Sequence, residues 1–392
     1  MNRMYRILTL NNISVKGLDR LPRERFETSS DIAHPDAILV RSADLHEQPI
    51  PESTLAIGRA GAGVNNIPVA DMTERGVPVF NAPGANANAV KELVIAGLFL
   101  AARNICPAWA YARSLEGTDA ELHEAMEANK KHYTGFELPG RTLGVIGLGA
   151  IGVQVANTAR ALGMNVVGFD PQITVDAAWA LDSGVEAAHS VGDVMARSDM
   201  VTIHVPLLEA TRGLINASRL AQAPSGASLL NFSRAEVVAE DDVRHALDED
   251  RLHAYISDFP SNTLKDHPKA VTLPHIGAST QEAQENCAIM AAEQVRDYLE
   301  TGNVRNAVNF PDVTMPRSGK GDRLCVVNAN VPNMLGQISS LLARHGINID
   351  DMYNKAQEQL AYTLVDVEGQ VPDEVTDELL AVEGVLKVRV IR

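Results

Sequence analysis

At 392 residues the chain is too long for a single hydrophobic core, so two or three domains are expected. Its formal net charge is −16, and only 4% of its residues are aromatic. An acidic surface repels nucleic acid and anionic membranes, and the scarcity of rings argues against base stacking. Three scattered cysteines and the lack of a bilayer-length apolar run predict a cytoplasmic protein without a metal site.

The first ninety residues alternate short apolar strands with polar segments, a pattern typical of a parallel α/β unit. The predicted strands are Tyr5–Leu10, Ala37–Arg41, Leu55–Arg59 and Val77–Asn81. Ligands of open α/β sheets bind beyond the carboxyl ends of the strands, so the loops that follow are candidate substrate contacts. These loops contain Arg41-Ser42, Gly61-Ala62-Gly63 and Asn81-Ala82-Pro83.

The middle of the chain predicts two helical segments and then a second α/β unit. Residues 88–104 form an apolar helix, and the charged segment 117–139 reads as a helical arm at a subunit interface. From Arg141 onward strands and helices alternate in a doubly wound, nucleotide-binding pattern that ends in a helix over about 279–301. Its predicted strands are Thr142–Gly147, Asn165–Asp170, Met200–His204, Ser228–Asn231, His253–Asp258 and Val271–Leu273.

The C-terminal region predicts a linker and a small separate module. Residues 311–322 are rich in proline, glycine and charge, which is typical of a linker. Residues 323–392 then read strand, helix, strand, strand, helix, strand, the order of a ferredoxin-like fold. The strands are Arg323–Asn328, Ile347–Lys355, Leu360–Val367 and Val385–Ile391, and the helices cover about 333–345 and 373–382.

A glycine motif predicts the cofactor site. The run Gly147-Leu148-Gly149-Ala150-Ile151-Gly152 contains G-x-G-x-x-G, follows an apolar strand and opens a helix. Asp170 ends the next strand, where its carboxylate would accept bonds from ribose hydroxyls and repel a 2′-phosphate. The motif therefore predicts NAD as the cofactor, against the alternative of a glycine-rich turn without a ligand.

Polar groups at the ends of the later strands converge on one sheet edge, where they suit hydride transfer. They are the run His204-Val205-Pro206, the pair Ser233-Arg234, Asp258 and His275. We expect His275 to accept a proton from the substrate, Arg234 to hold a carboxylate and Asp258 to accept a bond from the nicotinamide amide. His204 is more often a packing or cofactor contact, and a structural salt bridge is the alternative for Arg234.

Across essentially the whole chain the sequence resembles the D-isomer-specific 2-hydroxyacid dehydrogenase family, and within it the members that act on 3-phosphoglycerate. The segments that carry the resemblance are VRSADL (40–45), GRAGAGVNNI (58–67), FNAPGANANAVKEL (80–93), TLGVIGLGAIG (142–152), VTIHVPLLEATRGLIN (201–216), LLNFSRAEVV (229–238), YISDFP (255–260) and LPHIGASTQEAQEN (273–286).

The resemblance implies three domains. Residues 1–90 with 277–312 would be a discontinuous, flavodoxin-like substrate-binding domain, and residues 91–276 an NAD-binding Rossmann domain. Residues 313–322 would link these to an ACT regulatory domain over 323–392.

The resemblance also implies roles for individual residues. Arg41, Ser42 and Asn86 match positions that hold the substrate phosphate, and the loop around Gly63 matches the part that grips the carboxylate. Arg234 matches the catalytic arginine and His275 the proton-transferring histidine. The expected cofactor contacts are Gly147, Gly149, Ala150, Ile151, Gly152, Asp170, His204, Val205, Pro206, Thr211, Ser233, Asp258 and Gly277.

Three positions depart from the family pattern. The family usually has a glutamate where this chain has Thr263, and that glutamate pairs with the catalytic histidine. Either Asp266 substitutes for it or the histidine works without a carboxylate partner. Ala235 replaces a common glycine. Lys91 replaces a common alanine, and either adds charge for the substrate phosphate or is a surface lysine.

In the ACT-like region, Asn330 and Asn348 match the serine-binding positions of serine-inhibited members, although Asn333 replaces a usual glycine. The alternative is that this module only dimerises. We expect a homo-oligomer, dimer or tetramer, because the charged arm and the ACT-like module each offer a two-fold contact.

The functional hypothesis is NAD-dependent oxidation of 3-phosphoglycerate to 3-phosphohydroxypyruvate, the first step of L-serine synthesis. A dehydrogenase of another 2-hydroxy acid, such as glycerate, lactate or 2-hydroxyglutarate, is the second hypothesis. The third is an NADH-sensing binding protein that has lost catalysis.

Overall fold

The computed structural model describes residues 3–392, which divide into two compact units. One unit is residues 87–280, and the other combines the chain up to residue 86 with residues 281–392. The sequence predicted domain changes at 90/91 and 276/277, close to these positions. The C-terminal region, expected to be a domain of its own, is in the same unit as the N-terminal sheet.

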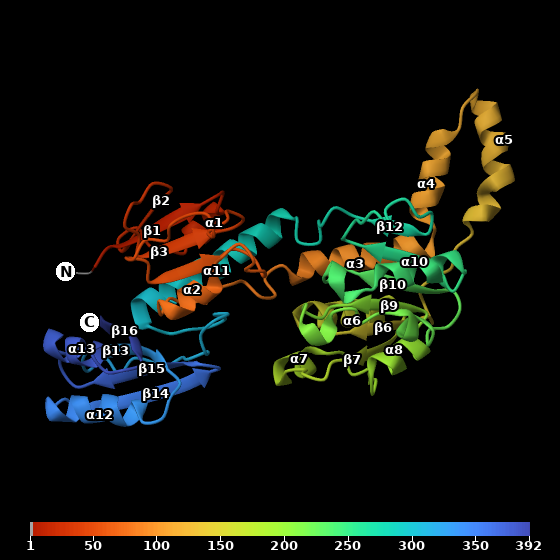
Figure 1. Ribbon diagram of the computed structural model, residues 1–392. Coiled ribbons are helices and arrows are strands. Elements are labelled where there is room, and N and C mark those ends of the chain that lie inside the picture. The colour runs from red at the N-terminus through yellow and green to blue at the C-terminus, as the bar shows by residue number, and fades with distance from the viewer. Residues whose placement is uncertain (1–2) are drawn as a thin grey trace. The chain divides into compact units, whose positions relative to one another are not determined.

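The discontinuous unit contains a five-stranded parallel sheet in the order β2-β1-β3-β4-β5 (Figure 1). This flavodoxin-like order places the topological switch point between β1 and β3. The central strand β3 is buried at all four residues, which explains its unbroken apolar run. The strands are β1 (Tyr5–Leu10), β2 (Phe26–Ser29), β3 (Ala37–Val40), β4 (Ala56–Arg59) and β5 (Val79–Phe80), of which β2 was not predicted.

A long helix, α11 (Gln281–Thr301), returns the chain to this sheet and packs against β4 and the short helix α1 (Val15–Leu18). Small buried side chains on α11, Ala288, Ala291 and Ala292, allow the close approach. The remaining helix beside this sheet is α2 (Val69–Glu74).

The C-terminal part of the same unit is an antiparallel sheet in the order β14-β15-β13-β16, and its βαββαβ order confirms the predicted ferredoxin-like module. Side chains of β13 alternate between two environments, as the period of a strand requires. Leu324 and Val326 pack under the two helices, whereas Cys325 and Val327 face the other way. The elements are β13 (Arg323–Ala329), α12 (Met334–Arg344), β14 (Ile349–Gln357), β15 (Leu360–Val367), α13 (Asp373–Leu380) and β16 (Val385–Ile391).

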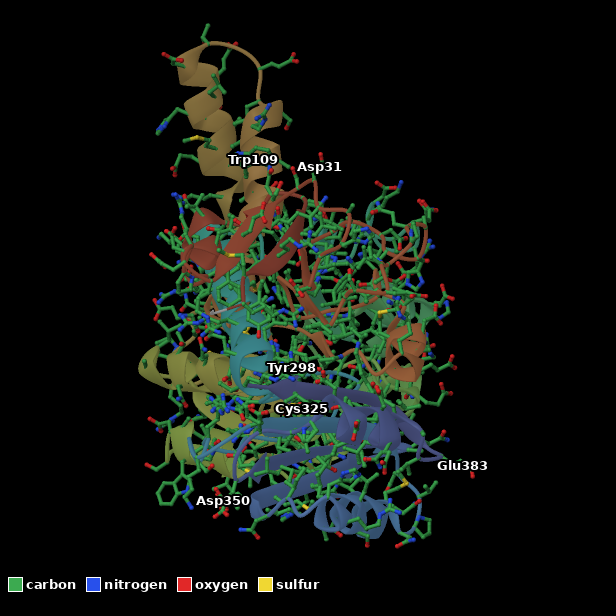
Figure 2. The ribbon with its side chains drawn as sticks, turned by 90° about the vertical axis from the view of Figure 1, so that its left-hand side faces the viewer. Asp31, Trp109, Tyr298, Cys325, Asp350 and Glu383 are labelled. Atoms are coloured by element: carbon green, nitrogen blue, oxygen red, sulfur yellow. The ribbon has the colours of Figure 1, made fainter. Side chains whose placement is uncertain are left out.

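The face of this sheet without helices shares one hydrophobic core with the five-stranded region. Figure 2 labels Tyr298 of α11 and Cys325 of β13, which both belong to that core. The segment predicted as a linker contributes to it, because Val313 and Met315 are buried there. The tertiary packing therefore holds this stretch in place despite its loop-like composition.

Buried Arg323 connects α11, the segment predicted as a linker and the antiparallel sheet. Arg323, fully enclosed, donates from Nε (2.5 Å) and Nη2 (2.9 Å) to the carboxylate of Asp366 on β15. Its other donors reach the backbone carbonyls of Thr301 at the end of α11 and of Met315 and Pro316. All five guanidinium N–H groups are thus used, which is the condition under which a buried charge is tolerated.

The second unit contains a seven-stranded parallel sheet in the order β12-β11-β10-β9-β6-β7-β8. The reversal of strand order between β6 and β9 is the switch point of a doubly wound nucleotide-binding fold, which confirms the predicted fold class. The strands are β6 (Thr142–Ile146), β7 (Asn165–Phe169), β8 (Val185–Ala187), β9 (Met200–Ile203), β10 (Ala227–Asn231), β11 (Leu252–Ser257) and β12 (Ala270–Thr272). The helices that flank them are α3 (Ala87–Ala102), α6 (Ala150–Ala161), α7 (Val175–Ala180), α8 (Val191–Arg197), α9 (Ala217–Leu220) and α10 (Glu240–Asp248).

The predicted arm, residues 117–139, contains α5 (Asp119–Asn129) and a helical turn up to Tyr133. With α4 (Ile105–Ser114), which the sequence did not place in the arm, it forms a pair of helices that project from the sheet of this unit (Figure 1). Neither helix has a buried residue, and Trp109 is 61% exposed. Within residues 3–392, no single helix is long and apolar enough to cross a bilayer, and α3 with α4 pass that test only jointly, across a 64° bend.

The network around Arg323 predicts a large effect of Asp366→Asn. The substitution leaves a buried guanidinium without a charge partner, so we expect a loss of about 3–5 kcal/mol of unfolding free energy, measured by denaturant titration. Breaking the exposed pair of Arg344 with Glu378 by Glu378→Gln should cost at most about 1 kcal/mol. Equal costs for the two variants would contradict the role given to Arg323.

Candidate functional site

The glycine turn lies after β6, at the switch point of the seven-stranded sheet. Gly147 has φ of +94°, in the region that favours glycine. A Cβ on Gly152 would lie 1.9 Å from the carbonyl oxygen of Gly147, so only glycine lets α6 begin this close to the turn. A Cβ on Gly149, in contrast, would meet nothing within 4 Å.

The open side of Gly149 and the start of α6 at Ala150 and Ile151 suit a pyrophosphate, because the free N–H groups of a helix N-terminus attract anions. Asp170 lies beside the turn, just beyond β7, and its Oδ2 accepts the backbone N–H of Leu148 at 2.8 Å. Its Oδ1 accepts the N–H of Gln172. The residues present therefore fit a dinucleotide, with the acid placed by the turn itself.

His204 follows β9 on the other side of the switch point. Its Nε2 lies 3.0 Å from Oγ1 of Thr202, and its Nδ1 is enclosed without a hydrogen-bond partner in the described chain. Burial lowers the pKa of His204 to about 3. The ring is therefore neutral at physiological pH, and its enclosed nitrogen is free for one further bond.

Hydrogen bonds in the loops after β9 and β10 hold predicted cofactor contacts in place. Ser233 donates from Oγ to the carbonyl of Val205 at 2.6 Å. Thr211 donates from Oγ1 to the carbonyl of Pro206 at 2.6 Å. The first bond joins the two loops and the second closes the loop after β9 on itself, so these residues form one connected edge.

Arg234 is an exposed residue whose side chain is not in a salt bridge within the described residues. Its Nη1 donates to the carbonyl of Ser233 at 2.7 Å. The alternative of a structural salt bridge, left open by the sequence, finds no support in these contacts. The remaining donors of the guanidinium are available to a carboxylate.

The loop that carries His275 is shaped by the buried side chain of Asp258. Its Oδ1 accepts the N–H of Ile276 at 2.8 Å, and its Oδ2 accepts the N–H of Gly277 at 2.7 Å. The backbone carbonyl of Asp258 also accepts the N–H of His275, which has φ of +56°. A carboxylate that is 2% exposed thus holds the backbone on which His275 is mounted.

The ring of His275 has an aromatic neighbour in place of an acidic one. It meets Phe259 edge to face, with centroids 5.0 Å apart at 62°. Within the part of the chain that the structure describes, no hydrogen bond or ion pair connects the ring to Asp266 or any other carboxylate. The sequence did not single out Phe259, although it directly follows Asp258.

In the discontinuous unit the loops after β1 and β3 meet at the switch point of the five-stranded sheet. Asn11, with φ of +66°, accepts at Oδ1 the N–H groups of Ser42 (2.9 Å) and Ala43 (2.6 Å). Arg41 donates from Nη1 to Oε1 of Gln284 on α11 at 3.2 Å. The sequence missed Asn11 and Gln284 because they become neighbours of Arg41 only through the fold.

The other predicted substrate contacts are less tightly grouped. Gly63 lies in the loop after β4, and Asn86 directly precedes α3. Lys91, on α3, donates from Nζ to Oδ1 of Asn88 at 2.6 Å. This contact leaves open whether Lys91 serves a substrate or only its own helix.

In the antiparallel module Asn330 and Asn348 lie in loops at the ends of β13 and α12. Asn330 donates from Nδ2 to the carbonyl of Glu358 at 3.0 Å, which fixes its side chain to the β14–β15 turn. Asn348 is exposed, and its carbonyl accepts the N–H of Glu368.

Comparison with known proteins identifies the family. Residues 105–277 match the NAD binding domain of the D-isomer specific 2-hydroxyacid dehydrogenases. Relatives from Haemophilus influenzae and Escherichia coli, each named D-3-phosphoglycerate dehydrogenase, are 31% and 32% identical to this chain. Their alignments cover 86% and 87% of this chain and 81% and 82% of theirs. The chain belongs to the D-isomer specific 2-hydroxyacid dehydrogenase family.

A third relative, a D-3-phosphoglycerate dehydrogenase of Methanocaldococcus jannaschii, is 37% identical over 305 residues. That alignment covers 75% of this chain but only 55% of the length of the relative. An NAD+-bound 3-phosphoglycerate dehydrogenase of Entamoeba histolytica has the same fold, at a TM-score of 0.59 and 24% identity over 78% of this chain and 98% of that one. The structure of the TT0316 protein from Thermus thermophilus matches with a TM-score of 0.61 and 27% sequence identity. That match covers 77% of this chain and 99% of the other.

The matched segment of the dehydrogenase contains the glycine turn, Asp170, Arg234 and His275. Since family membership and the fit of the turn agree, NAD is its cofactor and the chain is an NAD-dependent oxidoreductase.

Two alanine variants of the turn should separate folding from cofactor binding. Gly152→Ala forces α6 away from the turn and should lower the unfolding free energy by about 1–3 kcal/mol as well as NADH affinity. Gly149→Ala meets no protein atom, so it should leave thermal stability unchanged and lower NADH affinity by about 10-fold or more, since its methyl occupies the side open to pyrophosphate. Unchanged NADH fluorescence titration of Gly149→Ala would refute this placement.

Asp258→Asn should loosen the His275 loop. An amide NH2 would face a backbone N–H, so we expect a loss of about 1–3 kcal/mol of stability together with reduced turnover. The matched variant Asp266→Asn, at an exposed position, should change neither. A shifted pH profile of turnover in Asp266→Asn would instead identify Asp266 as the carboxylate partner of His275.

Proposed function

We propose that this enzyme oxidises 3-phosphoglycerate to 3-phosphohydroxypyruvate with NAD, the first step of L-serine synthesis. Two observations together support the proposal. Relatives named D-3-phosphoglycerate dehydrogenase match most of the chain, and Arg41, which suits a phosphate, directly follows the carboxyl end of β3. The guanidinium of arginine binds a phosphate group through two parallel hydrogen bonds. A 2-hydroxy acid without a phosphate group would give Arg41 no such partner.

The proposed roles follow from the placement of each side chain. In the discontinuous unit Arg41, Ser42 and Asn86 hold the phosphate, and the loop of Gly63 binds the carboxylate. In the nucleotide unit Arg234 has free donors that suit a substrate carboxylate, and such a bond would orient the carbinol carbon.

His275 takes the hydroxyl proton as the carbon–hydrogen bond breaks, which leaves the keto acid. NAD held at the glycine turn of Gly147, Gly149 and Gly152 would supply the hydride acceptor. His204 is less suited to proton transfer, because burial keeps its pKa at about 3. Its enclosed Nδ1 and the hydrogen-bonded loops of Val205, Pro206, Thr211 and Ser233 fit a role at the cofactor edge.

Phe259 gives the catalytic histidine an unusual setting. Without a carboxylate beside it, the imidazolium formed during oxidation receives no ionic stabilisation from the described residues, and the ring is held by aromatic packing and by its backbone. The same absence is the only observation that favours the rival hypothesis of an NADH-sensing protein without turnover.

The assembly and regulation of the enzyme are part of the proposal. The exposed α4 and α5, with Trp109 and Met126 uncovered, suit a two-fold contact in a homo-oligomer. Light scattering that gives a monomer mass would contradict this. Serine, bound at Asn330 and Asn348, is the proposed effector. The three free cysteines of the enzyme support a cytoplasmic setting.

The assay is NADH consumption with 3-phosphohydroxypyruvate, the favourable direction. We expect His275→Ala to lower kcat by about 10²–10⁴-fold while NADH still binds, because the proton donor is lost. His189→Ala, at an exposed histidine of the same unit, is the matched control. Full activity of His275→Ala would overturn the assignment, and NADH binding without turnover in the wild-type enzyme would select the sensor hypothesis.

Arg41→Gln tests the substrate. It should raise KM for 3-phosphohydroxypyruvate by about 10-fold or more and leave the reaction with glyoxylate unchanged, because only the former has a phosphate. Arg344→Gln is the control. A preference of the wild-type enzyme for glyoxylate or 2-oxoglutarate would select a dehydrogenase of another 2-hydroxy acid.

A further inference from the structure

A second cationic site lies in the discontinuous unit, at the amino end of the five-stranded sheet. There a cavity of about 660 Å³ opens between the start of β1, the end of α11 and the β16–α13 side of the antiparallel module. Five arginines line it: Arg3, Arg25, Arg317, Arg389 and Arg392. Glu300, Asp373 and Asp377 line it as well, and three of the arginines form ion pairs: Arg25 with Glu300, Arg392 with Asp373 and Arg3 with Asp36. Arg317 and Arg389 have no such partner within the described residues, so they give the cavity an excess of positive charge that suits an anion.

The cavity is separate from the proposed substrate loops. Tyr5, at the first residue of β1, lines the cavity, whereas Asn11 and Arg41 lie past the opposite ends of β1 and β3. Six extended residues span about 20 Å, so one phosphate cannot serve both places.

Arg389 is the most unusual of these side chains. It points from β16 toward α11, where its guanidinium lies 4.2 Å from the ring centroid of Tyr298 and Nη2 donates to the Tyr298 carbonyl. Figure 2 shows Tyr298 and Cys325 at this junction. The residue is partly buried, and its enclosed Nε and Nη1 have no hydrogen-bond partner anywhere in residues 3–392.

The neighbouring arginines also keep unused donors. Arg25 forms an ion pair with Glu300 at 2.7 Å, but its Nε is enclosed and unpartnered. Arg317 donates from Nη2 to the carbonyls of Gly321 and Ile391, and no carboxylate within the described residues pairs with it. Arg323, nearby in sequence, shows what a satisfied buried arginine looks like here, with all its donors used.

A guanidinium with two enclosed, unpartnered nitrogens costs free energy that an oxyanion would recover, because arginine cannot lose its charge. We propose that this cavity binds the phosphate group of a small molecule, with Arg389, Arg317 and Arg25 as its ligands. Thr376 and Asp377 line the same cavity, where the threonine hydroxyl can donate or accept and the aspartate carboxylate can accept a bond from a ligand hydroxyl. A phosphomonoester of a polyol therefore fits as well as free phosphate.

An occupant of this cavity would touch both parts of the unit at once. Arg389 belongs to β16 of the antiparallel module, whereas Arg25 precedes β2 of the five-stranded region. Binding would therefore strengthen the junction between them, which makes the site a regulatory one that acts through docking of the module.

The test is thermal unfolding of the full chain carrying Arg41→Gln, so that the proposed substrate loop no longer contributes, at constant ionic strength set with chloride. Inorganic phosphate, glycerol 3-phosphate and glycerol are the three probes. Ligand well above its Kd should raise Tm by several degrees with phosphate or glycerol 3-phosphate and not with glycerol. A larger shift with glycerol 3-phosphate identifies a phosphomonoester, and equal shifts identify free phosphate.

Arg389→Met in the same background should be as stable as its parent in chloride or more so, because a guanidinium with two enclosed, unpartnered nitrogens is removed. Its shift with phosphate should vanish. Arg317→Gln, at an exposed position, should reduce the shift and provides the test if the first variant fails to fold. Arg344→Met, on the outer face of α12, should retain it. The proposal is overturned by the absence of a shift in the parent, or by a full shift in Arg389→Met or Arg317→Gln. Since activity is not measured, these outcomes are independent of the substrate assignment.

Discussion

The nucleotide unit depends on one close approach, that of Gly152 to the carbonyl of Gly147. With no side chain at residue 152, α6 can begin immediately after the turn that ends β6. Asp170 is then drawn to the turn by the N–H of Leu148, so the acid that recognises ribose and the helix end that faces phosphate are placed together. His204 and the loops after β9 and β10 surround the same switch point. A single added methyl group would displace this whole arrangement.

Two arginines, the buried Arg323 and the partly buried Arg389, have different roles at the junction of the discontinuous unit. Arg323 uses every donor on Asp366 and three carbonyls and so fastens the antiparallel module to the end of α11. Arg389 contacts the same helix but leaves two donors empty. The first is explained by stability alone. Without a ligand, the unpartnered nitrogens of Arg389 lower the stability of the fold, and for this reason we propose that Arg389 binds a ligand.

The buried carboxylate of Asp258 positions His275 through hydrogen bonds to the backbone of its loop. Asp258 was expected to contact the nicotinamide amide, yet both of its oxygens accept N–H groups from the His275 loop. Phe259 packs edge to face against the ring of His275. The position of the imidazole therefore results from hydrogen bonds behind it and aromatic packing beside it.

The sequence by itself determined whatever depends on short stretches of chain. The glycine turn, most strands of both parallel sheets and the βαββαβ module follow from apolar periodicity and from spacings of a few residues. Tertiary structure alone decided the pairing of Arg323 with Asp366, the neighbours of Arg41 and the packing of residues 313–315, as well as the short edge strands β2 and β8. These features join residues tens to hundreds of positions apart. No local pattern records such contacts, because their energy arises only when folding brings the partners together and removes them from water.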